Sequence, residues 1–445
     1  MMIFPQQALK ALKILNNAGY EAYIVGGAVR DCLMGRPAGD IDITTQAHPD
    51  CVKKLFSDYN VIETGIKHGT VTVILDGESL EITTYRTETG YADSRHPDSV
   101  AFTASLQEDC ARRDFTVNSI CYNPDTGFVD YYGGTADIEK GIIRCVGNPV
   151  QRFEEDALRI LRAVRFASVL GFEIEEETKN AVFSCTHLLE NISAERIYAE
   201  LSKLLCGINV KKVLLEYTEV LAVFMPEIMH TKGFDQKNHH HIYDVLEHTA
   251  VAVENTPPVP QLRMAALLHD FGKPHTFTTD ENGTGHFYGH GEVSWQLSQN
   301  ILRRLKVSAG DYNLITMLVR RHDAPVAATE KSVRRALNKY GEQGLRMLLL
   351  LKRADNRGQN IRDFDRSAEY DQLEKMIDSV IEKQQCFSLK QLAVTGTDLM
   401  ALGIQPSKGM GDILNTLLDM VINGEAENNK ETLMAIARTL KGEIQ

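Results

Sequence analysis

Positive charge, paired cysteines and long apolar runs are all scarce in this chain of 445 residues. Lys and Arg number 48 against 60 Asp and Glu, and the net charge of -12 argues against binding of nucleic acid through overall charge, although a local basic surface could still bind it. The eight cysteines form no Cys-x-x-Cys pair and are typical of buried thiols in a reducing compartment. The longest apolar runs, such as 347–351, are far too short to cross a bilayer, and no secretory leader is recognisable. We therefore expect a cytoplasmic protein without a membrane anchor.

The hydrophobic content of 43% is sufficient for several cores. Apolar spacing predicts a helix over 6–18, a first strand over 21–25, and two strands over 70–75 and 79–86 that are joined at the turn pair Asp76-Gly77. From Phe153 onward the apolar residues recur every three or four positions, which indicates helices. The predicted fold class is α+β, with a mixed-sheet head followed by an all-helical remainder.

Two acids, Asp40 and Asp42, are separated by one isoleucine. On a strand they would share a face and repel each other, so a cation is expected between them. Carboxylate oxygens together with substrate phosphates are the ligands that Mg²⁺ prefers, and two metals can clamp both oxygens of a phosphoryl displacement. Glu81, on a neighbouring predicted strand, is the candidate for a third carboxylate. The alternative is a solvated strand end, which is the more common meaning of Asp-x-Asp alone.

Two glycines and an arginine precede these acids. Gly26 and Gly27 allow the backbone to approach a phosphate closely, and Arg30 adds positive charge. The arrangement predicts a triphosphate cradle beside a metal site.

Three stretches resemble one family in order and spacing: GGAVRDCLMGRPAGDIDITT at 26–45, ARRDFTVNS at 111–119 and EDALRILRAVRFA at 155–167. They are similar to the class II CCA-adding enzymes and bacterial poly(A) polymerases of the nucleotidyltransferase superfamily. The resemblance implies that Asp40 and Asp42 are metal ligands and that Gly27 and Arg30 meet the triphosphate. It also implies that a nucleotide site is lined by Arg113, Asp114 and Asn118.

Asp156 and Arg159 are three residues apart, and the helical spacing predicts that they are neighbours on one helix face. A carboxylate only accepts hydrogen bonds and a guanidinium only donates, so the pair matches the edge of cytosine or adenine. The family resemblance assigns base reading to this motif, and it adds Arg162 and Arg165 to the nucleotide site. The alternative is an ordinary intrahelical ion pair.

The segment 91–97 reads as a polar loop, which in the CCA family helps the site to switch from C to A; a plain surface connection is the alternative. The chain also lacks the Gly-Arg-Arg-Phe-Arg type of stretch that is associated with bacterial poly(A) polymerases, since it has GIKHGTVTVIL there. Both features favour CCA addition.

A second constellation consists of histidines and aspartates spread over the predicted helices. Neutral imidazoles and carboxylates can converge on one or two divalent metals that activate water, whereas a single histidine is more often a satisfied surface or core residue. The ordered series resembles the HD phosphohydrolase superfamily. Its members here are His248, His269, Asp270, His290, His322 and Asp355.

These inferences predict four domains: a nucleotidyltransferase head (1–145), a helical neck with the base-reading helix (146–235), an HD domain (236–365) and a helical tail (366–445). The tail stretch GTDLMALGIQPSKGMGDIL suggests a helix-turn-helix connection that contacts RNA, or a helix packed on its neighbour.

The expected function is transfer of CMP and AMP from CTP and ATP to the 3′ end of tRNA, with Mg²⁺ in the head and an unidentified divalent metal in the HD domain. Three alternatives stay open: a poly(A) polymerase, an HD phosphohydrolase with a nucleotide-binding head, and a non-catalytic RNA-binding module.

Overall fold

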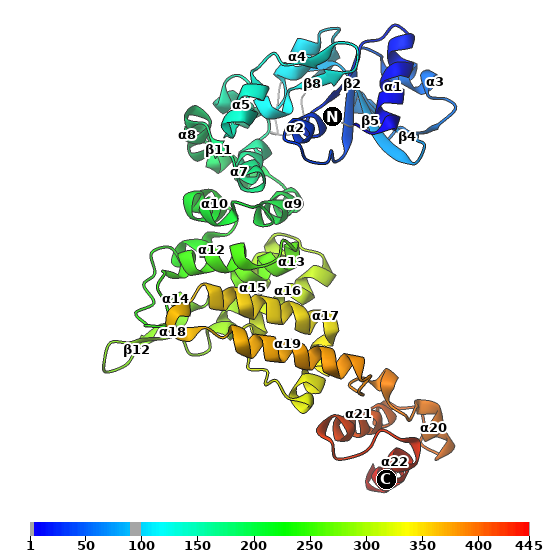
Figure 1. Cartoon of the computed structure of the whole chain (residues 1–445), viewed down its shortest axis with the longest axis vertical. Helices are drawn as coiled ribbons and strands as arrows, with labels where there is room; N and C mark the ends of the chain where they lie inside the picture. The colour runs from blue at the N-terminus through cyan, green and yellow to red at the C-terminus, as the bar shows by residue number, and fades with distance from the viewer. Residues whose placement is uncertain (1–3, 90–98, 445) are drawn as a thin grey trace. The chain divides into compact units, whose positions relative to one another are not determined.

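The computed structural model describes residues 4–89 and 99–444. The chain divides into two compact units (Figure 1). Unit 1 consists of residues 1–229 and 303–307, and unit 2 consists of residues 230–302 and 308–445. The predicted segment 91–97 lies outside the described residues. Unit 1 therefore includes the predicted head and residues 146–229 of the predicted neck, and the finer division into four domains stays a prediction.

A seven-stranded mixed sheet forms the centre of the head, in the order β3-β4-β5-β2-β1-β8-β9. Its strands in chain order are β1 (Ala22–Val25), β2 (Ile41–Thr45), β3 (Asn60–Ile62), β4 (Thr70–Leu75), β5 (Glu78–Thr84), β8 (Cys121–Asn123) and β9 (Gly127–Val129). Strands β2 and β5 run parallel, and every other neighbouring pair is antiparallel. The predicted hairpin is confirmed as β4 and β5. Asp76 and Gly77 both have positive φ (50° and 89°), as a tight hairpin turn requires.

The register of the sheet determines which side chains face the main core of the head. Ile41 and Ile43 of β2 and Leu80 and Ile82 of β5 are buried in this core. Because side chains alternate along a strand, Asp42 and Glu81 point to the opposite face. The head is completed by α1 (Gln6–Asn17), α2 (Gly27–Leu33), α3 (Pro49–Leu55), α4 (Leu106–Ala111) and α5 (Gly134–Lys140), and by the strand pair β6 (Arg86–Thr89) and β7 (Ser99–Phe102).

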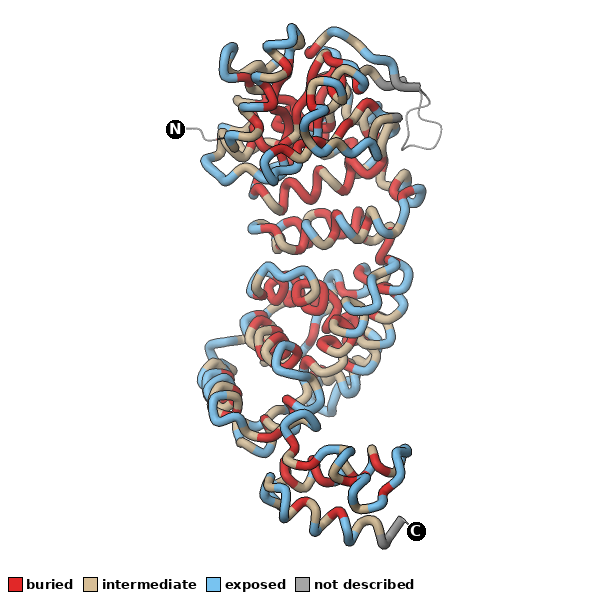
Figure 2. Tube along the Cα trace, turned by 90° about the vertical axis from the view of Figure 1, so that its right-hand side faces the viewer, coloured by how far each residue is buried: buried red, intermediate tan, exposed pale blue. Residues whose placement is uncertain are grey.

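The rest of unit 1 is helical apart from a short parallel pair of β10 (Ile142–Ile143) with β11 (Glu173–Ile174). Its helices are α6 (Pro149–Glu155), α7 (Leu158–Leu170), α8 (Glu176–Ser184), α9 (Ala194–Leu205), α10 (Val210–Glu216) and α11 (Thr218–Ala222). Helices α7 and α9 pack against each other, and both carry buried residues along their length (Figure 2).

Unit 2 is almost entirely helical. Its helices are α12 (Val245–Asn255), α13 (Pro260–Leu268), α14 (Lys273–Thr276), α15 (His290–Arg304), α16 (Ala309–Arg321), α17 (Glu330–Arg357), α18 (Ile361–Phe364), α19 (Ser367–Glu382), α20 (Gly396–Ala401), α21 (Lys408–Asn423) and α22 (Lys430–Ile444). A small hairpin of β12 (Thr278–Thr279) and β13 (Gly285–His286) precedes α15. Gly341, with φ of 69°, breaks α17 into two parts. The tail forms its own apolar cluster, and α20 and α21 give the predicted helix-turn-helix connection.

The fold class is as predicted: a mixed-sheet head followed by helices. Among the described residues, every helix is too short or too polar to traverse a lipid bilayer.

Candidate active site and metal centre

Two of the three predicted acids of the head, Asp42 and Glu81, lie on the sheet face opposite its main core. Asp42 of β2 lies in register with Glu81 of β5, so the third carboxylate lies on the neighbouring strand, as predicted. Strand β2 begins at Ile41, so Asp40 lies just before the strand at an exposed position, and only Asp42 of the two acids is part of it. The pKa of Asp42 is raised to about 6, chiefly by burial, with smaller contributions from the charges of Glu81 and Asp40 that the cation of Arg113 opposes. The three oxygen donors and their mutual repulsion fit a hard divalent cation.

A positive φ of 79° at Gly26 brings the backbone close to these acids. A Cβ atom at this position would lie 3.6 Å from Asp42 Oδ2 and 3.7 Å from Arg113 Nη1. Arg113 is ion-paired with Asp109 at 3.3 Å, and its Nε is buried without a hydrogen-bond acceptor among the described residues. These two distances are ordinary van der Waals contacts, so it is the positive φ that favours glycine here, next to a carboxylate and a cation that both belong to the predicted site.

Arg30 is buried and already has partners: Nη1 donates to Asn118 Oδ1 at 2.7 Å, and Nε and Nη2 donate to Asp31 Oδ1. Asn118 in turn donates to Asp114 at 3.1 Å. Asp114 also accepts from Arg162 at 2.9 and 2.5 Å. Although burial opposes ionisation, Arg162 and Asn118 lower the pKa of Asp114 to about 2. A continuous polar network therefore runs from the predicted triphosphate cradle to α7.

The predicted geometry of Asp156 and Arg159 is wrong. They do not share a helix face, because Asp156 has extended angles (φ -140°, ψ 102°) at the end of α6 and α7 begins at Leu158. The alternative of an ion pair between them also fails. Asp156 is instead paired with Arg196 at 3.1 Å, and Arg159 is paired with Glu155 at 2.8 Å.

Arg165 of α7 is ion-paired with the buried Glu200 of α9. Sequence reasoning missed Asp109, Arg196 and Glu200. Asp109 is fully buried and binds Arg112, Arg113 and the Thr44 hydroxyl. Its spacing of three and four residues from the two arginines was a usable signal.

In unit 2 the six predicted histidines and aspartates converge. The atoms that could bind a metal form two groups, each with all atoms within 4.8 Å of one another: His248, His269, Asp270 and Asp355, and Asp270 with His290 and His322. Asp270 belongs to both groups, so its two oxygens can bridge two ions. These are the groups of this kind found in the described part of the chain, and the acids of the head are not among them.

The hydrogen bonds of the four imidazoles fix their tautomers. Each Nδ1 lies within 2.7 to 2.9 Å of a backbone carbonyl, which can only accept, so Nδ1 carries the proton. The Nε2 lone pairs then face one another, at 3.2 Å between His248 and His269 and 3.0 Å between His290 and His322. Two lone pairs at this distance repel each other unless a cation binds both nitrogens. When both imidazoles are neutral, that cation is a metal ion.

In the absence of a metal ion, protonation of an imidazole can relieve the repulsion between the Nε2 lone pairs. Burial lowers the pKa of His269, but Asp270 and Asp355 outweigh burial and raise it to about 10.

Lys273 was not among the predicted residues. It is buried, with its ammonium 2.7 Å from Asp270 Oδ2 and 2.8 Å from Gln236 Oε1. Nitrogen and oxygen donors together fit a divalent transition metal.

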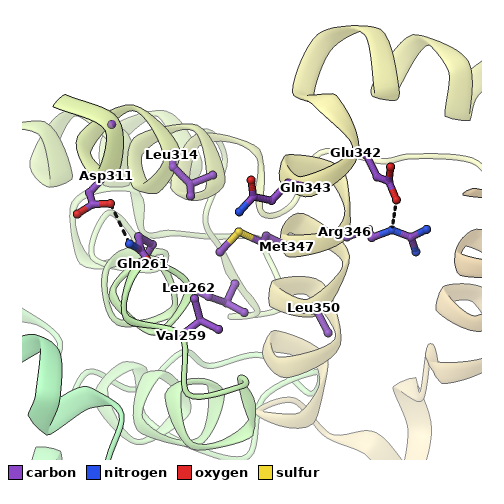
Figure 3. A pocket seen from close by; sticks show the side chains of 11 residues that line it. Val259, Gln261, Leu262, Asp311, Leu314, Glu342, Gln343, Arg346, Met347 and Leu350 are labelled. Atoms are coloured by element: carbon purple, nitrogen blue, oxygen red, sulfur yellow. Dashed lines mark hydrogen bonds and ion pairs between the residues drawn. The ribbon is translucent and has the colours of Figure 1, made fainter. Parts of the chain in front are cut away.

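A cavity of about 750 Å³ lies elsewhere in unit 2 (Figure 3). It is lined by α13, α16 and the second part of α17, with Leu262, Leu314 and Met347 among its apolar residues. None of the predicted site residues lines it.

Comparison with known proteins identifies three matching family models. Residues 22–144 match the poly A polymerase head domain, residues 171–231 match a probable RNA and SrmB-binding site of polymerase A, and residues 291–437 match a putative tRNA nucleotidyltransferase domain 2.

Relatives and solved structures agree with these models. A CCA-adding enzyme of Ligilactobacillus salivarius is 35% identical over 98% of this chain and 96% of its own length. One of Streptococcus thermophilus is 33% identical over 98% and 97%. The crystal structure of the Bacillus stearothermophilus CCA-adding enzyme in complex with CTP has a TM-score of 0.74 and 30% identity and covers 99% of both chains. The Thermotoga maritima enzyme complexed with tRNA has a TM-score of 0.58 at 20% identity over 100% and 97% of the two chains, a likeness of fold.

Proposed function

Because this chain belongs to the family of CCA-adding enzymes, we propose that it transfers CMP and AMP from CTP and ATP to the 3′ end of tRNA. The 3′ hydroxyl is the nucleophile and pyrophosphate is the leaving group, and no covalent enzyme intermediate is needed. The observation that carries the proposal is that Asp42 and Glu81 lie in register on neighbouring strands, next to Asp40. Gly26, which has no side chain, lies beside Asp42 on the same face of the sheet.

Asp40, Asp42 and Glu81 would hold Mg²⁺, which when bound neutralises charge on the triphosphate and lowers the pKa of the attacking hydroxyl. Arg113 supplies positive charge next to Asp42, and the buried Asp109 holds Arg113 in place. Gly26 and Gly27 allow the phosphates to approach the backbone, while Arg30, Asn118 and Asp114 stabilise the wall of the site.

We assign reading of the base to Asp156 and Arg159. Asp156 lies at the break between α6 and α7, and its carboxylate, held by the Leu158 amide and Arg196, has further acceptor capacity for the amino group of C or A. Arg159 uses three of its five N–H donors, on Arg152 O, Arg112 O and Glu155, so two donors are left for a ring nitrogen. Arg162 and Arg165 stabilise α7 through their ion pairs with Asp114 and Glu200, and we assign them no contact with the base.

The test is incubation with a tRNA that lacks its 3′ CCA, with CTP and ATP supplied separately and together. Addition of two C residues and one A followed by arrest is expected. Unlimited addition of A would favour a poly(A) polymerase, and absence of addition at saturating Mg²⁺ would refute nucleotidyl transfer.

A second activity is favoured by the six converging residues of unit 2. The opposed Nε2 lone pairs and the shared Asp270 support a two-metal phosphohydrolase site of the HD type, at which the four imidazoles, Asp270 and Asp355 would hold the metals. When bound, such metals activate water for attack on a phosphate ester.

This activity is separable from nucleotide addition, because its residues lie in the other unit. His269→Ala together with Asp270→Ala should abolish metal-dependent hydrolysis of bis-p-nitrophenyl phosphate and leave CCA addition unchanged. The matched control is His286→Ala, an exposed pair with Asp280 outside the cluster. If the folded double variant loses nucleotide addition in step with hydrolysis, the two sites are not independent.

A further inference from the structure

Helix α9 carries two opposite charges one turn apart on the side that faces α7. Arg196 and Glu200 are four residues apart and therefore neighbours on one helix face. Arg196 Nη2 lies 3.1 Å from Asp156 Oδ2 and 3.4 Å from Oδ1. Glu200 is buried, is ion-paired with Arg165, and lies 3.8 Å from Arg162. Arg196 and Glu200 thus each contact a residue of opposite charge from the segment to which we assign base reading.

The Asp156 side chain depends on Arg196 for its position. Asp156 has extended backbone angles and is the C-cap of α6, where its amide donates to Arg152 O and its carbonyl accepts from the Arg159 amide, so the helix backbone does not fix the direction of its side chain. Besides Arg196, its carboxylate accepts only from the Leu158 amide at 3.1 Å, and only through Oδ1. Among the described residues, Oδ2 has Arg196 alone as donor. The arginine therefore restrains the orientation of the carboxylate.

The side chain of Arg196 contacts Asp156 and, among the described residues, makes no other hydrogen bond. Within the same part of the chain, its Nη1 is buried without an acceptor. The pair is only partly exposed, with 25% of the Arg196 side chain and 21% of the Asp156 side chain accessible. An arginine placed for stability alone would be expected to satisfy its other donors, because a buried donor without a partner is costly.

The chemistry of the four bases gives this restraint a consequence. Cytosine and adenine present an amino group where uracil and guanine present a carbonyl oxygen, and a fixed carboxylate accepts from the first and repels the second. A carboxylate that can rotate away no longer repels the carbonyl. We propose that Arg196 is a specificity-determining positioning residue, which holds the Asp156 carboxylate toward the base and so excludes UTP and GTP. This inference rests on the proposed role of Asp156 in base reading.

The experiment compares incorporation of all four nucleotides into a tRNA that lacks its 3′ CCA, by Arg196→Met, Arg196→Lys and the full-length wild type. Arg196→Met should lower kcat/KM for CTP and ATP roughly tenfold and lower the preference over UTP and GTP by a similar factor. Arg196→Lys keeps the charge without the planar fork and should recover part of the preference. Glu195→Gln is the matched control, because Glu195 is the adjacent residue of α9 in an exposed pair with Lys306, and it should behave as the wild type.

A purely structural role gives a different pattern: a lower melting temperature and an equal loss for all four nucleotides. An unchanged ratio of CTP and ATP to UTP and GTP in folded Arg196→Met would overturn the proposal. If that variant loses its helical circular dichroism, Arg196→Gln replaces it under the same criterion. Asp156→Ala is measured in parallel. If the preference for CTP and ATP changes in Asp156→Ala but not in Arg196→Met, only the proposed role of Arg196 is refuted. If the preference changes in neither variant, base reading by Asp156 is refuted as well.

Discussion

Asp114 joins Asn118 of the proposed nucleotide site to Arg162 of α7, and its removal should affect both stability and activity. Its buried carboxylate accepts from Arg162, from Asn118 and from the Phe115 amide at 2.8 Å. Asp114→Asn keeps the shape of the side chain and removes its charge. The pKa of Asp114 falls from an ordinary value of 3.8 to about 2, a difference equivalent to about 2 kcal/mol in favour of the ionised form.

The sign of the pH dependence follows from this lowered pKa. The stabilisation is fully present above the unfolded pKa, near 4, and is lost as the pH falls through the folded value of about 2. At any pH from 4 to 7, the free energy of unfolding of unit 1 should therefore be about 2 kcal/mol lower in Asp114→Asn than in the wild type. Below pH 4 the difference between variant and wild type should shrink.

The single tryptophan makes the assay selective. Trp295 lies in unit 2, so its fluorescence reports that unit, while circular dichroism reports both. In urea, Asp114→Asn should shift the circular dichroism transition and leave the Trp295 transition in place. Nucleotide addition should fall as well, because Arg162 and Asn118 lose their shared partner. An unshifted circular dichroism transition at pH 7 would refute the view that this carboxylate stabilises unit 1.

Three further changes test the two sites. Asp42→Ala should abolish nucleotide addition without lowering the melting temperature, because it removes a metal ligand and relieves repulsion from Glu81; unimpaired addition at equal Mg²⁺ would contradict this. Gly26→Ala should raise KM for CTP and ATP and cost roughly 1 to 3 kcal/mol of stability, since φ is positive there and the added carbon lies between Asp42 and Arg113; an unchanged KM in steady-state assays would argue against a cradle at this turn. Removal of metal by EDTA should stop both activities, and Mg²⁺ alone should restore addition but not hydrolysis of bis-p-nitrophenyl phosphate; recovery of hydrolysis with Mg²⁺ alone would contradict a transition-metal site.

The sequence predicted those parts of the fold and site that depend on local periodicity. The alternation of β4 and β5 and the Asp76-Gly77 turn gave the hairpin, and the series of histidines and aspartates in unit 2 gave a cluster whose members converge. Glu81 was placed correctly because it lies on a strand adjacent to β2.

What sequence reasoning missed depends on long-range contacts. The helix expected through Asp156 breaks at that residue, and spacing alone cannot show such a break inside a run of good helix formers. Arg196 follows Asp156 by 40 residues in sequence, and Glu200 follows Arg165 by 35, so no local pattern pairs them. Asp109 was within reach, because its spacing to Arg112 and Arg113 is helical.

The donor sets of the two sites imply different relations to their metals. The head offers carboxylate oxygens on an open sheet face, and a triphosphate must supply further ligands, so a hard cation can arrive and leave with each nucleotide. Unit 2 offers four imidazoles whose Nδ1 protons are fixed by backbone carbonyls, around two buried or half-buried carboxylates. Such a cluster is organised before any substrate binds, and its opposed lone pairs are costly without a cation. Under the proposed function, the two ligand sets therefore suit different metals, an exchangeable one for transfer and a resident one for hydrolysis, because they differ in donor type and lie in separate units.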